Sequence, residues 1–351
     1  MGKGNGDIGK PAEDGFTMTV NDWGGLVEVP MAGGSPRTHS STADLRAAVN
    51  TYATIPDFVV NGIHTNAGNW SYIFNEQYVY KPESGLIWTY EPKKYWPQAG
   101  EVDFYAYAPA GIRNFITGLN NNGDGTSPPV IEYKMPYKTN EEPPYGTGEP
   151  TAPLVVDDNQ EDLLVAVQNS ELPWQTTDPV HFTFRHAFSR VFVKAKSEQN
   201  DNRYRIKVVR VELRNLYTQG KLELKADNTS DPISTGIPVG KNEQFRYGSS
   251  GDVILWSGQK TPADYHFNLL SSAVTVKNDY TTLLNSDDGV FVMPQVVQSN
   301  TALYVAYDIY TVSQTDGEQY HSSASKLLPF ASGFAFEIGK QYEIQATLNV
   351  P

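Results

Sequence analysis

The sequence contains no cysteine. Disulfides, thiolate nucleophiles and cysteine-ligated zinc sites are therefore excluded. No stretch approaches the roughly 20 consecutive apolar residues that a membrane-spanning helix needs, and no signal peptide is recognisable. The absence of cysteine is compatible with the cytosol, and equally with an exported protein that folds without disulfides. The opening MGKGNGDIGK resembles an appended start or a flexible tether on a trimmed chain.

Charged residues are also scarce, and acidic residues outnumber basic ones by 40 to 27. Charged residues make up 19% of the 351 residues, and the net charge is −13. This balance argues against nucleic acid and against electrostatic docking on anionic lipid. The hydrophobic and aromatic fractions, 39% and 12%, are sufficient for packed cores. At this length two domains are the first expectation.

Recognisable catalytic and cofactor motifs are missing too. The chain has no G-x-S-x-G elbow, no P-loop and no Rossmann glycine fingerprint, and its six histidines show no tight ligand spacing. His181 and His186 are five residues apart on one expected strand, so their side chains would face opposite sides of a sheet. A packed or hydrogen-bonded histidine is the favoured interpretation. No catalytic residue, cofactor or metal ligand is predicted.

Two loops imitate a cation site. Residues 120–125 resemble the start of a calcium loop, but the twelfth position, which requires a bidentate Glu, holds Ile131. The acidic stretch 156–162 could gather carboxylates around a cation. Polar turns and a solvated acidic loop are the favoured interpretations.

Aromatic residues between 87 and 96 leave a second alternative open. Trp88, Tyr90, Tyr95 and Trp96 could form a platform on which a carbohydrate stacks, although aromatics in such a position more often belong to the core. A pair of carboxylates for glycoside hydrolysis could be distant in sequence, but nothing local indicates one.

What the chain has is aromatic residues and turn formers: 21 Tyr, 15 Phe, 29 Gly and 23 Pro. This composition favours strands and turns. In 102–108, for example, Val102, Phe104, Ala106 and Ala108 alternate with Asp103, Tyr105 and Tyr107. Only 41–53 carries a clear helix signal near the N-terminus. Many short strands separated by turns predict an all-β protein built of antiparallel sandwiches.

The pattern also suggests a division of the chain. A flexible N-terminal segment (1–15) would precede an N-terminal β-sandwich domain (16–175) and a C-terminal one (176–351), with the boundary inside 168–180, where periodicity lapses.

A change of parity follows this boundary. Apolar residues occupy even positions up to Phe188 and odd positions from Val191. One residue must be absorbed between them, so a β-bulge or bend is predicted near Ser189 and Arg190.

The terminal strand shows the cleanest alternation. It is apolar at every second position and polar between them, and it runs almost to the last residue. Its apolar positions are Tyr342, Ile344, Ala346, Leu348 and Val350.

Four stretches in order resemble the Bacteroidales fimbrillin family, the Mfa-like and FimA-like subunits of type V pili. They are similar to the family's tryptophan strand leading to F-x-A-Y-x-P, its F-x-H-x-x-S strand, its hydrophobic-P-Q strand and its G-x-x-Y terminal strand. These stretches are IWTYEPKKYWPQAGEVDFYAYAP (87–109), DPVHFTFRHAFSRVFVKA (178–195), VFVMPQ (290–295) and FEIGKQYEIQATLNV (336–350).

The resemblance implies two transthyretin-like antiparallel β-sandwich domains in tandem. It also implies an exported lipoprotein at the cell surface, anchored in the outer membrane through a lipidated Cys upstream of this sequence. The implied function is that of a structural subunit (stalk, tip or accessory) of a fimbrium that supports cell adhesion. Its implied partners are other pilus subunits and a glycan or protein receptor on a host or bacterial surface.

The resemblance further implies assembly by strand exchange. In this family a protease removes an N-terminal strand, and a strand from the next subunit fills the exposed groove. Arg37, in the polar loop GGSPRTHSS, is the predicted cleavage site; Arg46 is its rival, inside the predicted helix. The terminal strand 342–350 is the predicted donor. In an isolated subunit we expect it to be the last ladder strand of its own domain.

Two other functions remain as alternatives. One is a monomeric, surface-anchored glycan-binding or adhesin protein of the same fold. The other, less favoured, is an enzyme on a β-sandwich.

Overall fold

The computed structural model describes two short N-terminal segments and most of the chain from residue 56 onward. The described residues are 16–22, 27–31, 56–81, 88–92, 97, 99–120, 130–135, 137–138, 154–156, 160–171, 180–197, 203–225, 253–260, 265–268, 272–284, 289–297, 299–331 and 334–349. The predicted flexible segment 1–15 and the predicted helix 41–53 lie outside them.

The fold is almost entirely β, which confirms the predicted class. The only helical element in the described ranges is one 3-10 helix, η1 (Ala110–Phe115). None of the described helical residues forms a helix long and apolar enough to cross a bilayer. The transthyretin-like, tandem arrangement stays a prediction.

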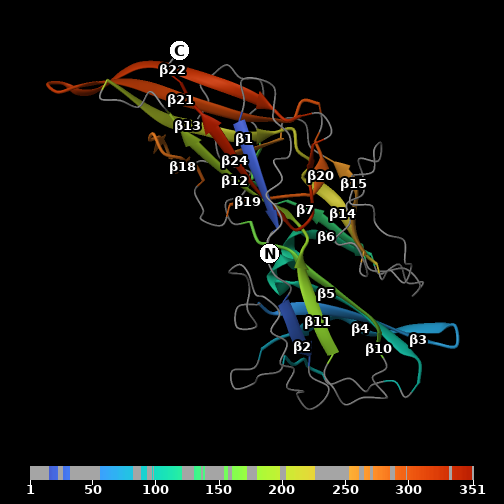
Figure 1. Ribbon diagram of the computed structural model, residues 1–351. Coiled ribbons are helices and arrows are strands. Elements are labelled where there is room, and N and C mark those ends of the chain that lie inside the picture. Colours follow the sequence, from blue (N-terminus) through green and yellow to red (C-terminus); the bar gives the residue numbers. More distant parts are fainter. Residues whose placement is uncertain are drawn as a thin grey trace, which may run out of the picture.

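Six strands form one sheet at the bottom of Figure 1, here called the lower sheet. In spatial order they are β2 (Val27–Met31), β11 (Val180–His186), β10 (Leu164–Glu171), β5 (Glu101–Ala108), β3 (Phe58–Asn66) and β4 (Asn69–Val79).

Both faces of the lower sheet are buried at its central strand β5. On β5, Phe104 and Ala106 lie in an aromatic core together with Phe182. Tyr105 and Tyr107, on the opposite face of the same strand, are 5% and 1% exposed and belong to the larger core above the sheet. The alternation described for 102–108 is present, and Tyr105 and Tyr107 on the second face are buried as well. Tyrosine rings bury as readily as aliphatic side chains when a second core covers them.

Above the lower sheet lie four further sheets (Figure 1). The terminal-strand sheet runs β1 (Phe16–Asp22), β24 (Lys340–Thr347), β12 (Ser189–Lys196) and β18 (Thr281–Thr282), with β19 (Val290–Val292) also on β12. The long sheet runs β22 (Gly317–Pro329), β21 (Ala302–Ser313), β13 (Tyr204–Arg214), β16 (Tyr265–Asn268), β9 (Leu154–Val156) and β8 (Tyr137–Lys138), with β17 (Val274–Thr275) on β13. The smaller sheets are β15 (Val253–Lys260), β14 (Gln219–Lys225), β7 (Val130–Lys134) and β6 (Ile116–Asn120), and the pair β20 (Gln295–Val296) and β23 (Ala335–Phe336).

The terminal-strand sheet and the long sheet share one core. Every second residue of β12 and β24 is buried, and the first part of β21 shows the same alternation. All three strands contribute these side chains to one hydrophobic cluster. The hydroxyl of Tyr307 on β21 donates to the carbonyl of Asn349, just beyond β24, at 2.8 Å. Burying one face of each sheet against the other is the packing of a β-sandwich.

Strands that precede the predicted domain boundary pair with strands that follow it. β11 pairs with β10, β7 pairs with β14, and β1 pairs with β24. The predicted boundary falls largely on 172–179, outside the described residues, so its position stays a prediction.

The parity change after β11 occurs slightly earlier than predicted. The strand is interrupted at Ala187 and Phe188, and β12 begins at Ser189. The predicted site, Ser189 and Arg190, already lies inside β12. The physical reason is that the apolar residues on either side do not share one core. Phe182 and Phe184 fill the aromatic core of the lower sheet, whereas the residues of β12 fill the core of the sandwich.

A buried glutamine connects two loops of the upper part. Gln295 is fully buried, and its side-chain oxygen accepts from the backbone N–H of Tyr217 at 2.7 Å. Its amide nitrogen donates to the carbonyls of Tyr217 (3.1 Å) and Met293 (2.8 Å). One side chain therefore replaces the backbone partner that a neighbouring strand would offer. This residue is the Gln of the hydrophobic-P-Q motif.

We expect Gln295→Leu to lower the free energy of unfolding by about 3 kcal/mol, because it leaves the N–H and the C=O of Tyr217 buried without this partner. Chemical denaturation would measure the change. The matched control is Gln319→Leu on the exposed strand β22, which should change stability by less than about 0.5 kcal/mol. Equal effects of the two substitutions would contradict the proposed role of Gln295.

Candidate functional site

The terminal strand β24 is an inner strand of its sheet. It pairs antiparallel with β1 on one side and parallel with β12 on the other. Tyr342, Ile344, Ala346 and Leu348 are each at most 1% exposed. The strand is thus part of the ladder of its own subunit, as expected for the isolated chain. Val350, the last of the predicted donor positions, lies outside the described residues.

A tight turn positions the start of β24. Gly339 has a φ of 68°, which favours glycine, and its N–H donates to the carbonyl of Phe188 at 3.0 Å. The hydroxyl of Tyr342 accepts from the N–H of Glu337 at 2.7 Å and donates to the carbonyl of Ala335 at 3.1 Å. Burial raises the pKa of Tyr342, so the phenol stays protonated and remains a donor. These contacts explain the G-x-x-Y spacing of the terminal motif.

The outward face of β24 carries an ion pair with β12. Nζ of Lys194 lies 2.7 Å from a carboxylate oxygen of Glu343, whose other oxygen accepts from Gln345 at 2.6 Å. Burial raises the pKa of Glu343, but the bonds from Lys194 and Gln345 outweigh it, and the pKa is lowered overall. Being partly exposed, the pair adds little stability, and it orients two neighbouring strands.

Both strands before Arg37 are edge strands. All seven residues of β1 pair with β24, from Phe16 opposite Ala346 to Asp22 opposite Lys340. β2 pairs with β11 and forms the edge of the lower sheet. The N-terminal segment thus covers one edge in each part of the molecule (Figure 1).

The F-x-H-x-x-S motif also has a structural explanation. His186 is 3% exposed, and its Nδ1 lies 2.5 Å from a carboxylate oxygen of Asp162. Ser189 donates to the carbonyl of Glu337 at 2.8 Å, which joins β12 to the turn before β24. The interpretation of His186 as a packed, hydrogen-bonded histidine is confirmed. The side chain of His181 lies outside the described residues.

Of the other sequence candidates, only some lie among the described residues. Trp88 and Tyr90 are 1% and 3% exposed and lie in the aromatic core, so the core interpretation is confirmed for both. Tyr95 and Trp96 lie outside the described residues. The two loops with a cation-like pattern also fall largely outside them, on 121–129 and 157–159. Within the described part of the chain, no group of three or more His, Asp or Glu side chains could hold a metal ion.

The structure brings the predicted donor strand next to the segment that cleavage would release. Arg37 and Arg46 themselves lie outside the described residues. The pairing of β1 with β24 was not predicted, although the sequence carries a signal for it. Phe16, Met18 and Val20 alternate with polar residues, and all three stand opposite apolar positions of β24.

Comparison with known proteins gives one family. The family model described as fimbrillin-like matches residues 45–350. A crystal structure of a fimbrial protein from Bacteroides vulgatus ATCC 8482 is similar over 83% of this chain and 88% of that chain, with 17% identity and a TM-score of 0.51. A crystal structure of a candidate cell adhesion protein from Bacteroides ovatus ATCC 8483 is similar over 93% of this chain and 94% of that chain, with 13% identity and a TM-score of 0.42.

At 17% identity, the similarity to the first structure concerns the fold alone. The TM-score of the second structure is too low to support a conclusion. No curated protein matches the chain. The family model, however, matches far more than half of the sequence. The chain therefore belongs to the fimbrillin-like family.

Proposed function

We propose that the chain is a non-catalytic structural subunit (stalk, tip or accessory) of a bacterial surface fimbria, assembled by protease-triggered strand exchange. Its family makes it a fimbrial or adhesion protein of the cell surface. A lipid anchor in the outer membrane, on a Cys upstream of this sequence, belongs to the proposal.

The observation that carries the proposal is the edge position of β1. Among the strands that the structure describes, β1 alone pairs with the outer side of β24. Proteolysis after Arg37, six residues beyond the end of β2, would release both edge strands. The backbone donors and acceptors of β24 that point toward β1 would then lose their partners, and an incoming strand could replace them.

Because β24 is an inner strand, its donation to another subunit would require several contacts to break. To leave its sheet, the strand must break ladders with both β1 and β12 and expose four buried side chains. Removal of β1 abolishes one of these ladders in advance. The donor role of 342–350 remains our proposal, and the edge that β1 vacates is the proposed acceptor.

We expect trimming after Arg37 to expose one side of β24 only. Along a strand, successive N–H groups point to opposite neighbours. Amide hydrogen exchange should therefore accelerate at alternate residues of β24, while amides bonded to β12 stay protected. Residue-resolved exchange before and after trimming measures this. Amides of β21, which has neighbours on both sides, serve as the internal control; unchanged protection throughout β24 would contradict the edge role of β1.

We expect a disulfide across β1 and β24 to block assembly. The chain has no cysteine, so Thr17→Cys with Gln345→Cys gives one defined bond between directly paired positions. After cutting with an Arg-specific protease, the oxidised protein should stay monomeric and the reduced protein should form SDS-resistant ladders. The control pair is Thr311→Cys with Gln319→Cys, which locks β21 to β22 and should not affect assembly.

Further variants and peptides identify the cleavage site and the donor. Arg37→Ala should abolish cutting and assembly, and Arg46→Ala should not. A peptide of residues 340–350 should cap the trimmed subunits and stop polymer growth, unlike its scrambled form. If a peptide of residues 16–22 inhibits growth and the 340–350 peptide does not, the donor assignment is wrong. Trimmed protein that remains monomeric would instead favour a monomeric glycan-binding adhesin.

A further inference from the structure

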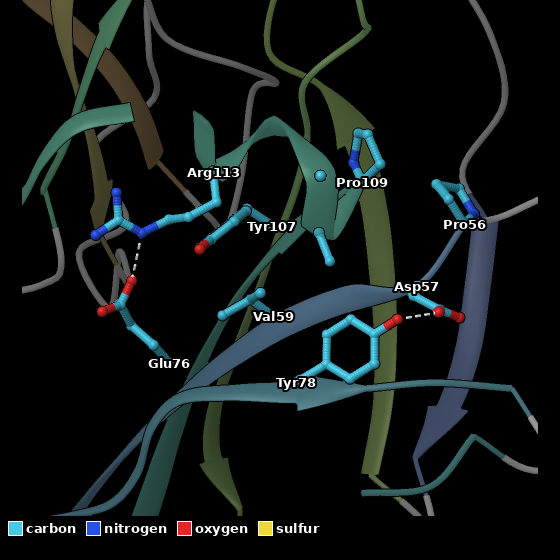
Figure 2. A pocket seen from close by; sticks show the side chains of 10 residues that line it. Pro56, Asp57, Val59, Glu76, Tyr78, Tyr107, Pro109 and Arg113 are labelled. Atoms are coloured by element: carbon cyan, nitrogen blue, oxygen red, sulfur yellow. Dashed lines mark hydrogen bonds and ion pairs between the residues drawn. The ribbon is translucent and has the colours of Figure 1, made fainter. Parts of the chain in front are cut away.

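A pocket opens where β3, β4 and β5 meet η1 (Figure 2). Its volume is about 670 Å³, and its ten lining residues all lie between Pro56 and Arg113. Sites for small ligands commonly enclose about 300–1,000 Å³. None of these ten residues belongs to β1 or β24. The pocket is therefore a feature separate from the edge at which assembly is proposed.

A β-bulge on β4 forms one wall. The register between β3 and β4 shifts at this point, and Glu76 takes a φ of 46°, a conformation unusual for a residue other than glycine. The side-chain oxygen of the buried Asn61 accepts from the N–H of Glu76 at 2.9 Å and holds the bulge. Bulges of this kind redirect a side chain. Here Glu76 reaches Arg113 of η1, whose Nε lies 2.8 Å from its carboxylate.

The floor of the pocket contains a buried hydroxyl without a protein partner. Tyr107 is 1% exposed, and its hydroxyl makes no hydrogen bond with the protein. Figure 2 shows this hydroxyl on the side of the Glu76 and Arg113 pair. Burial, reinforced by the charge of Glu76, raises the pKa of Tyr107, so the group is a neutral phenol that can both donate and accept. A buried polar group normally has a partner, so this one points to a ligand or water in the pocket.

The opposite wall offers an aromatic face. Tyr78 is 47% exposed and stacks against Tyr80, with ring centroids 6.1 Å apart and planes at 21°. Its hydroxyl donates to the carboxylate of Asp57, which fixes the ring at the mouth of the pocket (Figure 2). That hydrogen bond raises the pKa of Tyr78. The backbone carbonyl of Asp57 in turn accepts from the N–H of Ala110 at 2.6 Å and holds η1 beside β3.

We propose that this pocket binds one neutral sugar unit of a surface glycan. The apolar face of a pyranose ring would pack on Tyr78, and its hydroxyls would bond to the hydroxyl of Tyr107 and to the carboxylates at the rim. Sugar hydroxyls can bond to all of these groups, because they can donate to the carboxylates of Asp57 and Glu76 and accept from the hydroxyl of Tyr107.

The charges of the pocket favour a neutral sugar over an acidic one. Glu76 is balanced by Arg113, and Asp57 leaves a net negative charge at the rim. The whole chain carries a further excess of acidic residues, with a net charge of −13. A sugar acid would be repelled by this field. The proposal depends on the pocket alone and holds whether or not the subunit polymerises.

The test is a saturation-transfer NMR titration of the full chain with glucose, galactose, mannose, N-acetylglucosamine and glucuronic acid. At least one neutral sugar should bind with a dissociation constant on the order of 1 mM, and glucuronic acid should bind more weakly. Tyr78→Ala should weaken binding about tenfold by removing the stacking face. Tyr107→Phe should weaken it about three- to tenfold by removing one hydrogen bond.

Stability separates a binding role of Tyr107 from a structural one. Its hydroxyl has no protein partner, so Tyr107→Phe should leave the melting temperature unchanged while binding falls. The matched control is Tyr342→Phe, whose hydroxyl bonds to two backbone groups: it should lower the melting temperature and leave binding intact. Tyr320→Ala, at an exposed tyrosine outside the pocket, should change neither property.

Several outcomes would overturn the proposal. One is that no neutral sugar binds measurably at concentrations up to about 50 mM, far above the expected dissociation constant. Equal binding to the wild type, Tyr78→Ala and Tyr107→Phe is another. Preference for glucuronic acid over all neutral sugars, or saturation by neutral pentapeptides alone, would also rule out a neutral saccharide site.

Discussion

The pairing of β24 with two strands from distant parts of the chain is the interaction on which the upper part of the molecule depends. β1 comes from the N-terminus and β12 from the middle of the sequence, and each pairs with β24 over seven residues. The buried side chains of β24 complete the core that faces the long sheet. First and last strands therefore lie side by side, and the first of them is an edge. Cleavage in the N-terminal segment would therefore remove one of the two strands that pair with β24.

The two parts of the molecule are coupled through shared packing. The chain passes from β11 to β12 across Ala187 and Phe188, and in doing so it changes from the aromatic core to the sandwich core. The lower sheet also contributes one of its faces to the larger core, through Tyr105 and its neighbours. Ser189 and Gly339, two residues of the motifs that carry the family resemblance, lie beside the passage from β11 to β12. Motif residues Ser189, Gln295, Gly339 and Tyr342 each form a hydrogen bond with a backbone group outside the strand ladders.

The edge proposed for assembly and the pocket use different elements. The edge belongs to β1 and β24, whereas the pocket belongs to β3, β4, β5 and η1. A subunit organised in this way could join a polymer through one region and hold a ligand in another. The pocket also depends on the core, because Tyr107 reaches it from the same face of β5 that carries the buried Tyr105.

The sequence by itself determined the all-β class, the alternation of β24 and β12, and the motif residues, because side-chain periodicity along a strand is a local property. It could not decide which strand covers β24, nor that the tyrosines of β5 meet a second core, because strand pairing and burial arise from contacts between distant segments. The parity change was predicted at Ser189 and Arg190 rather than at Ala187 and Phe188, because alternation alone does not show that the residues on either side pack in two different cores. The pocket carried no sequence signal. A bulge at Glu76, a buried phenol at Tyr107 and a 3-10 turn bearing Arg113 become one site only when the tertiary structure brings three strands and that turn together.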